Sequence, residues 1–115
     1  MEIKIIKNSI TRVELKKIAH EGFGDMVKAA VDVEKGIMAL GGDLHMDELE
    51  LLIERECSNH QHVWGINLYP EKEGVEFIEF DSMVNLKPAF GNRSRAVDNL
   101  ETQKQITEII NKLIK

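Results

Sequence analysis

The sequence predicts an α+β fold in which a mainly antiparallel sheet is covered by helices, as a two-layer sandwich. This prediction rests on three features. The 115 residues suffice for one domain, which we place over residues 1–115. Alternating apolar runs occur in two pairs joined by short turns, as in β-hairpins. Three further segments are apolar on one helical face only. We therefore expect the order β-α-β-β-α-β-β-α, with helices covering mainly one side of the sheet.

The chain begins with a strand and a capped helix. Residues 2–7 alternate imperfectly between apolar and polar, which predicts a strand. Thr11 and Glu14 have the spacing of a capping box, in which each side chain bonds to the backbone amide of the other residue. Apolar residues recur at helical spacing as far as Gly22, which suits the left-handed residue that ends a helix. This pattern predicts a helix over 12–21.

A hairpin and a second helix follow. Residues 26–33 and 37–41 alternate on either side of Gly36, which can take a positive φ without steric cost. Both faces of this hairpin are fairly apolar, which predicts a central place in the sheet. The apolar stripe that comes next predicts a helix over 46–56. Four methionines are expected to fill the core, namely Met26, Met38, Met46 and Met83.

The last third of the chain predicts a second hairpin and a C-terminal helix. Residues 63–69 form the first arm, 70–74 the turn and 75–86 a long second arm. Residues 88–95 are a polar loop. Asp98 has the spacing of another capping residue, and an amphipathic helix follows it.

Charge and cysteine content bear on partners and location. Fifteen basic and twenty acidic residues give a net charge of -5, so DNA is not an expected partner, because duplex binders need a basic excess. The single cysteine, Cys57, cannot form an internal disulfide, which indicates a reducing compartment. The N-terminus is too charged for a secretory signal, and no apolar run is long enough to span a membrane. We therefore expect a cytoplasmic protein that does not bind membranes.

The second hairpin holds the most informative polar residues. A symmetric turn would place Asn67 opposite Phe77 and Gly65 opposite Glu79. Because Gly65 has no side chain, a gap would remain in front of Glu79. The polar residues predicted to share one face are Asn67, Tyr69, Glu79, Asp81 and Asn85. The loop just beyond them adds Asn92, Arg93 and Arg95.

This face has two interpretations. In the first, it is a site: His45 or Asp81 acts as the base, Glu79 acts as the acid, and Arg93 with Arg95 clamps an anionic substrate. The remaining residues, Asn67, Tyr69, Asn85 and Asn92, would then bind substrate. In the second, which we favour because most surface ion pairs are not sites, the face is solvated and an arginine salt bridge holds the loop.

A second group of polar residues has the types that zinc prefers. Cys57, His60 and His62 lie within one short loop, and His45 or Asp47 could supply a fourth donor. A structural zinc site needs four ligands in a closed set, and three loose donors do not make one. We favour a polar surface loop and expect no metal and no cofactor.

Several stretches together resemble a small uncharacterised prokaryotic family that is classed as a domain of unknown function. The stretches that carry the resemblance are 22–28, 31–39, 41–45, 64–70, 80–85 and 91–94. The resemblance covers nearly the whole chain, but residues 57–62 depart from the family. The resemblance implies no activity. The matched stretches contain Trp64 and a set of the candidate site residues. These candidates are His45, Asn67, Tyr69, Asp81, Asn85, Asn92 and Arg93.

Two functions remain open from the sequence. One is a small soluble binding or regulatory domain, with a groove or a homodimer interface on the polar sheet face. The alternative is a hydrolase or phosphodiesterase that acts on an anionic small molecule. A weaker third idea is RNA contact through Lys87, Arg93 and Arg95.

Overall fold

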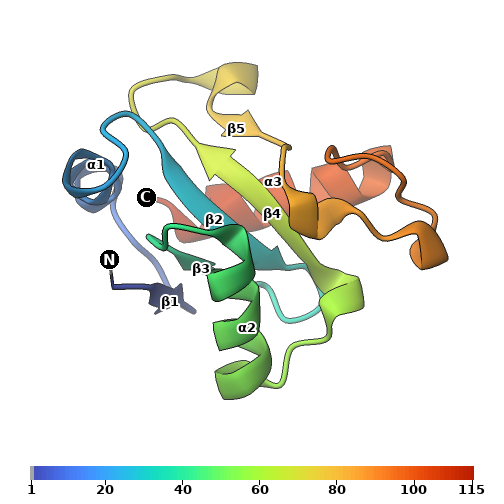
Figure 1. Ribbon diagram of the computed structural model, residues 1–115. Helices are drawn as coiled ribbons and strands as arrows, with labels where there is room; N and C mark the ends of the chain where they lie inside the picture. Colours follow the sequence, from blue (N-terminus) through green and yellow to red (C-terminus); the bar gives the residue numbers. More distant parts are fainter. Residues whose placement is uncertain (1) are drawn as a thin grey trace.

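A five-stranded antiparallel sheet forms the middle of the molecule (Figure 1), in the strand order β1-β3-β2-β4-β5. The computed structural model describes residues 2–115. Its strands are β1 (Lys4–Ile6), β2 (Val27–Asp32), β3 (Ile37–Leu40), β4 (Val63–Leu68) and β5 (Ile78–Glu79). Its helices are α1 (Arg12–Glu21), α2 (His45–Glu56) and α3 (Leu100–Leu113). The predicted α+β class and antiparallel pairing are confirmed.

The hairpin β2–β3 is central, as its two apolar faces predicted. Ala30 pairs with Ala39 across the hairpin, and β2 also pairs along its whole length with β4. The Asp32 side chain accepts hydrogen bonds from the backbone amides of Glu34 and Lys35, which fixes the turn before Gly36. Every residue of β2 and β3 except Lys28 is buried, so both faces of this hairpin are covered.

Helices cover both faces of the sheet, which adds a layer to the predicted sandwich (Figure 1). Residues of α1 and α3 pack on one face, and Leu49 and Leu52 of α2 pack on the other, against Ala30 and Ala39. The reason lies in β2, where both the odd and the even side chains from Ala29 to Val31 are apolar and each set needs cover. None of the helices within residues 2–115 has the length and apolar composition of a membrane span.

The second hairpin differs from the prediction in register and in length. Asn67 pairs with Glu79 and Leu68 with Ile78, two residues away from the symmetric pairing. The turn is longer because residues 74–76 form a 3-10 turn. The second arm has only the two residues of β5, and a 3-10 turn over Met83–Asn85 follows where the strand was expected to continue.

Gly65 and Asn85 explain why the second arm leaves the sheet. The Asn85 amide oxygen accepts from the Gly65 amide at 2.8 Å, and its Nδ2 donates to the Gly65 carbonyl at 2.9 Å. One side chain thus takes the place of a neighbouring strand. A Cβ on Gly65 would lie 2.4 Å from Ser82 Oγ, so the predicted gap beside Gly65 is filled by this turn.

Two of the predicted helix starts depend on side-chain caps. The capping box of Thr11 and Glu14 is present at α1. Helix α3 is capped by Asn99, whose side chain accepts from the Thr102 amide. Asp98, the predicted cap, instead accepts hydrogen bonds from Ser94 Oγ and the Arg93 amide and holds the preceding loop.

Candidate functional site

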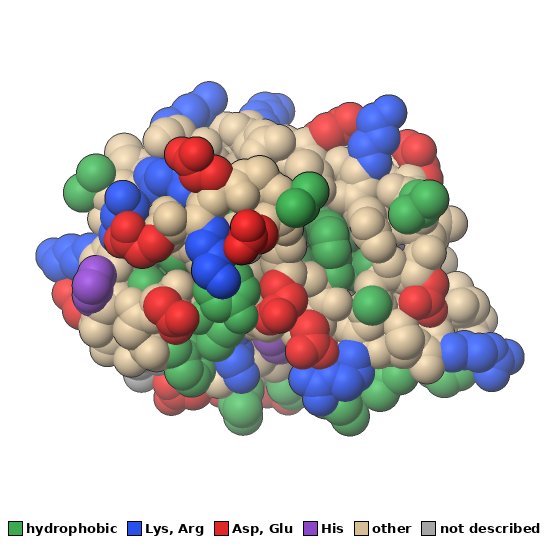
Figure 2. Space-filling view, turned by 90° about the horizontal axis from the view of Figure 1, so that it is seen from above, with side chains coloured by type: hydrophobic (Ala, Val, Ile, Leu, Met, Phe, Trp, Pro, Cys, Tyr) green, Lys and Arg blue, Asp and Glu red, His purple; other side chains and the backbone are tan. Residues whose placement is uncertain are grey.

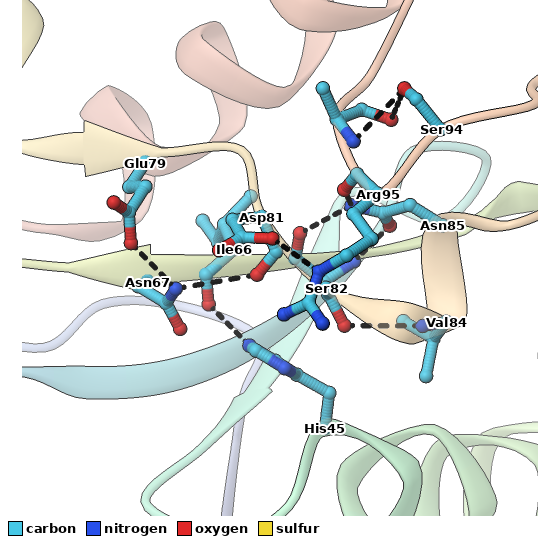
Figure 3. Close-up of polar contacts among 12 residues, drawn as sticks. His45, Ile66, Asn67, Glu79, Asp81, Ser82, Val84, Asn85, Ser94 and Arg95 are labelled. Carbon is cyan, nitrogen blue, oxygen red and sulfur yellow. Dashed lines mark hydrogen bonds and ion pairs between the residues drawn. The ribbon is translucent and has the colours of Figure 1, made fainter.

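An open groove of about 370 Å³ lies on the α2 face of the sheet, between the start of α2, strands β2 and β4, and the segment after β5. Its polar lining is Lys28, His45, Asn67, Asp81, Ser82 and Arg95. Its apolar lining is Met26, Leu44, Met46, Met83 and Val84. Figure 3 shows polar residues of this groove approaching one another from the start of α2, from β4, from the segment after β5 and from the loop before α3.

Asn67 lies on β4 and is only 7% exposed. Its Nδ2 donates to Glu79 Oε1 at 2.8 Å and to the Asp81 carbonyl at 3.3 Å (Figure 3). Both partners can only accept, so they fix which end of the amide carries the nitrogen. The Oδ1 atom therefore points the other way, towards the His45 ring, whose Nε2–H is already donated to the Ile66 carbonyl. No donor reaches this buried oxygen with hydrogen-bond geometry.

His45 is the first residue of α2 and is 9% exposed. Its Nε2 lies 2.8 Å from the Ile66 carbonyl (Figure 3). A carbonyl only accepts, so Nε2 carries the proton and Nδ1 of the neutral ring has a free lone pair. Burial is the largest influence and lowers the pKa of His45, while the Ile66 hydrogen bond acts in the opposite direction. The charge of Lys28 also lowers this pKa, while the nearby Asn67 side chain, as a hydrogen-bond acceptor, and the charge of Asp81 raise it more weakly. The ring is therefore neutral at pH 7.

Asp81 and Arg95 form an ion pair at the mouth of the groove, with 2.7 Å between Arg95 Nε and Asp81 Oδ1. Both side chains are about half exposed, so the pair itself contributes little stability. The Arg95 backbone is held more firmly, because its carbonyl accepts from the Asn85 side chain and from the Ser82 amide. The turn that leaves the sheet therefore also positions Arg95.

Lys28 is a groove residue that the sequence analysis missed. It lies on β2 opposite Asn67, and its Nζ is 5.2 Å from the centre of the Phe23 ring. No carboxylate in residues 2–115 lies within ion-pair distance of its ammonium. The one signal in the sequence that could have identified Lys28 is a charged residue on a fairly apolar face of a strand predicted to be central.

The apolar lining also differs from expectation. Of the four methionines predicted to fill the core, Met38 is fully buried. Met46 is 46% exposed and Met83 is 61% exposed, while Met26 is partly buried. These three line the groove. Exposed apolar side chains around a few polar groups are typical of small-molecule sites.

The structure brings together four of the predicted site residues, which are His45, Asn67, Asp81 and Arg95. Tyr69 and Glu79 lie next to them but do not line the groove. The Tyr69 hydroxyl donates to Glu79 Oε1 at 3.0 Å. Burial, and then Glu79, raise the pKa of Tyr69. The predicted sharing of one face by Asn67, Tyr69 and Glu79 is confirmed by these bonds, although their register was wrong.

The other predicted residues lie apart from the groove. Asn85 is fully buried in its bonds to Gly65. Asn92 is 4% exposed, donates to the Asn85 and Ala96 carbonyls and accepts from the Asp98 amide. Arg93 is exposed. These asparagines organise the loop that ends at Arg95.

Lys87 is buried rather than on a basic surface. Its side chain donates to the Val84 carbonyl at 2.9 Å and lies 4.9 Å from the Trp64 ring. Burial lowers the pKa of Lys87 to about 8. The residue is only 4% exposed, so it does not join the two arginines in a patch for RNA.

The group Cys57, His60 and His62 is spread over the end of α2 and the turn after it. Cys57 is exposed at the helix C-terminus with φ 57°. His62 Nε2 lies 3.5 Å from Glu34 Oε2. Within residues 2–115, no three His, Cys, Asp or Glu side chains are grouped as a metal site would need.

A larger hollow of about 450 Å³ lies between α1, β1 and Gly41. Its charged lining consists of exposed side chains of both signs, which are Glu2, Lys4, Glu14, Lys17 and Glu21. Figure 2 shows acidic and basic side chains interspersed on the face that it presents. We interpret this hollow as ordinary solvated surface, because its charged groups are exposed and can be hydrated.

Comparison with known proteins gives a match over nearly the whole chain. A family model described as a protein of unknown function, DUF5674, matches residues 4–113. Neither the search of curated proteins nor the search of solved structures found a match.

Proposed function

The chain belongs to the DUF5674 family of proteins of unknown function, and we propose that it is a binding domain that takes a small ligand in the groove between α2 and β4. The observation that carries the proposal is the Asn67 amide oxygen, which is fixed in orientation, buried and unpartnered. Leaving such an acceptor without a donor costs about 1–3 kcal/mol. A ligand N–H or O–H that reached this atom would recover that cost.

The surroundings of Asn67 support the same proposal. The groove volume of about 370 Å³ falls in the range of small-molecule sites. The exposed Met46 and Met83 are flexible and can move aside to admit a ligand to the buried oxygen. The Asn85 side chain holds the Arg95 backbone through a hydrogen bond to its carbonyl. The polar part of the groove is therefore preorganised for a ligand.

The hydrolase alternative has less support. It needs Glu79 as an acid beside the substrate, but Glu79 accepts from Asn67 and Tyr69 and does not line the groove. It also needs a pair of arginines, of which only Arg95 lines it. His45 with its free Nδ1 is the observation that favours it. A homodimer through this face is a third use of the groove, and a cytoplasmic location remains a prediction from the sequence.

A fragment screen by nuclear magnetic resonance tests the binding proposal. We expect the backbone amide shifts caused by the fragments that bind to concentrate on His45, Asn67, Ser82 and Val84. Substitution Asn67→Leu should abolish these shifts, while Asn59→Leu, in the exposed loop after α2, should leave them unchanged. Shifts that concentrate instead at Lys4 and Glu14, in the larger hollow, would contradict the proposal.

A further inference from the structure

We infer that the ligand of the groove is a small monoanionic carboxylate with an apolar side chain and an N–H or O–H donor, and that Lys28 binds its carboxylate. This inference rests on the proposed function, because it names the chemistry of a ligand for the same groove. It follows from the charges of the residues that line the groove, from the position of Lys28 and from the exposed apolar residues of the lining.

The charged groups of the groove leave one positive charge uncompensated. Asp81 and Arg95 neutralise each other through their 2.7 Å contact. The buried His45 ring is neutral at pH 7, as its environment requires. Among the residues that line the groove, Lys28 is therefore the one charge without a counter-charge. The Glu79 carboxylate lies outside the lining, where it accepts from Asn67 and Tyr69. A single unpaired ammonium balances the charge of one monoanion, such as a carboxylate, through a charge-assisted hydrogen bond.

Glu48, in the first turn of α2, is a carboxyl group near enough for the charge of Lys28 to act on it. It is fully buried, and its Oε2 accepts from the Gly42 amide at 2.9 Å. Burial raises the pKa of Glu48 to about 9, so this group is uncharged at pH 7. Lys28 is thus held on a central strand, beside the Phe23 ring, without an anionic partner in the described chain.

The rest of the lining specifies the remainder of the ligand. Leu44, Met46 and Met83 are each between 46% and 61% exposed, and burying them would favour the entry of an apolar side chain. Asn67 Oδ1 requires a donor. Lys28 and Asn67 are direct neighbours in the pairing of β2 with β4, so one small molecule can reach both. An N-acylated amino acid with an apolar side chain carries all three features.

The test compares N-acetyl-L-leucine with N-acetyl-L-leucinamide, which has the same shape without the charge. Amide shifts are followed by nuclear magnetic resonance in the protein, in Lys28→Met and in the control Lys35→Met, which lies in the exposed β2–β3 turn. We expect the acid to bind the groove at least about tenfold more tightly than the amide, which is the factor that one charge-assisted hydrogen bond provides. Lys28→Met should remove this difference, and Lys35→Met should keep it.

Three results would overturn the inference. Equal binding of acid and amide in the groove, or an acid preference that survives in Lys28→Met, would reject the carboxylate and Lys28 while leaving the groove as a binding site. Absence of saturable shifts with the acid would also reject it, and the fragment screen would then decide separately whether the groove binds any ligand. Far-ultraviolet circular dichroism of Lys28→Met, compared with that of the unsubstituted protein, checks that the variant is folded.

Discussion

Among single residues, the buried polar groups show how this protein holds charges and hydrogen bonds in its interior. Asn85 satisfies both backbone groups of Gly65. Lys87 keeps its ammonium against a carbonyl and an indole ring. Glu48 has one oxygen bonded to Gly42 and the other unpartnered. Each of these residues is polar in the sequence, and only its neighbours in space explain why it is buried.

Glu48 makes the stability of the protein depend on pH. Its pKa is raised from 4.5 to about 9 by burial, so the folded state holds a proton that the unfolded state releases. The resulting stability is fully present below pH 4.5 and is lost as the pH rises towards 9. We expect the free energy of unfolding to fall by about 1.4 kcal/mol per pH unit from this group within that window.

The prediction is checked with Glu48→Gln, which keeps a neutral group of the same shape. Urea unfolding at about pH 6 and about pH 7 should show this extra loss in the protein but not in Glu48→Gln. Lys87 and His45 titrate in both proteins, so their contributions cancel in the comparison. The exposed Glu50→Gln should behave like the unsubstituted chain. Parallel pH profiles for the protein and Glu48→Gln would mean that Glu48 is ionised when buried.

Among the elements, the turn after β5 determines where the sheet ends and where the groove begins. Ser82 and Val84 of this turn pack directly against Gly65 in β4. The contact is so close that position 65 has no room for a side chain. The same turn presents Met83 to the groove and holds the backbone of Arg95 through Asn85. A close contact between two elements thus positions the polar side of the candidate site.

This contact predicts a large effect of Gly65→Ala. The added Cβ would lie 2.4 Å from Ser82 Oγ and 2.8 Å from Val84, so the turn must move or the strand must shift. We expect a loss of about 3 kcal/mol in the free energy of unfolding, the upper end for overpacking. Urea unfolding measures it.

Gly91→Ala is the matched control. Gly91 has φ 86°, and no atom lies within 4 Å of the place that a Cβ would occupy. Its substitution therefore adds backbone strain of about 1 kcal/mol but no clash. Equal losses for Gly65→Ala and Gly91→Ala would show that the turn does not pack on β4 as closely as described.

In the molecule as a whole, two apolar clusters share one sheet. The α1 and α3 side contains Ala29 and Val31, and the α2 side contains Ala30 from the same strand. Segments near the two ends of the chain are tied together as well, because Ile10 exchanges backbone hydrogen bonds with Leu113 and Lys115. Because both clusters contain residues of β2, displacing β2 from one cluster would also expose the other. We therefore expect both clusters to unfold together.

The measurement follows unfolding in urea with two probes. Trp64, the one tryptophan, is 8% exposed and reports on the α1 and α3 side through its fluorescence. Circular dichroism reports on all three helices, α2 included. We expect coincident transitions. A circular dichroism change that begins well before the fluorescence change would show that α2 detaches as an independent unit.

Local patterns in the sequence were enough to predict the class of fold, the places of the helices and the central hairpin. These features follow from the 3.6-residue and two-residue periods, the Thr11–Glu14 cap and the turn at Gly36. The same patterns placed Asn67, Tyr69 and Glu79 on one face, since a register error of two residues preserves the face of every side chain.

The third layer, the end of the second arm and the groove itself were set by long-range packing. Each depends on contacts between residues far apart in the chain, which no periodicity encodes. The Asn85 side chain can take the place of a neighbouring strand only because Gly65 has no side chain that would keep this turn away from its backbone amide. Lys28 joined His45 and Asn67 only because β2 lies beside β4 and beneath the start of α2. The candidate site is therefore a product of packing, while the elements that carry it are a product of sequence pattern.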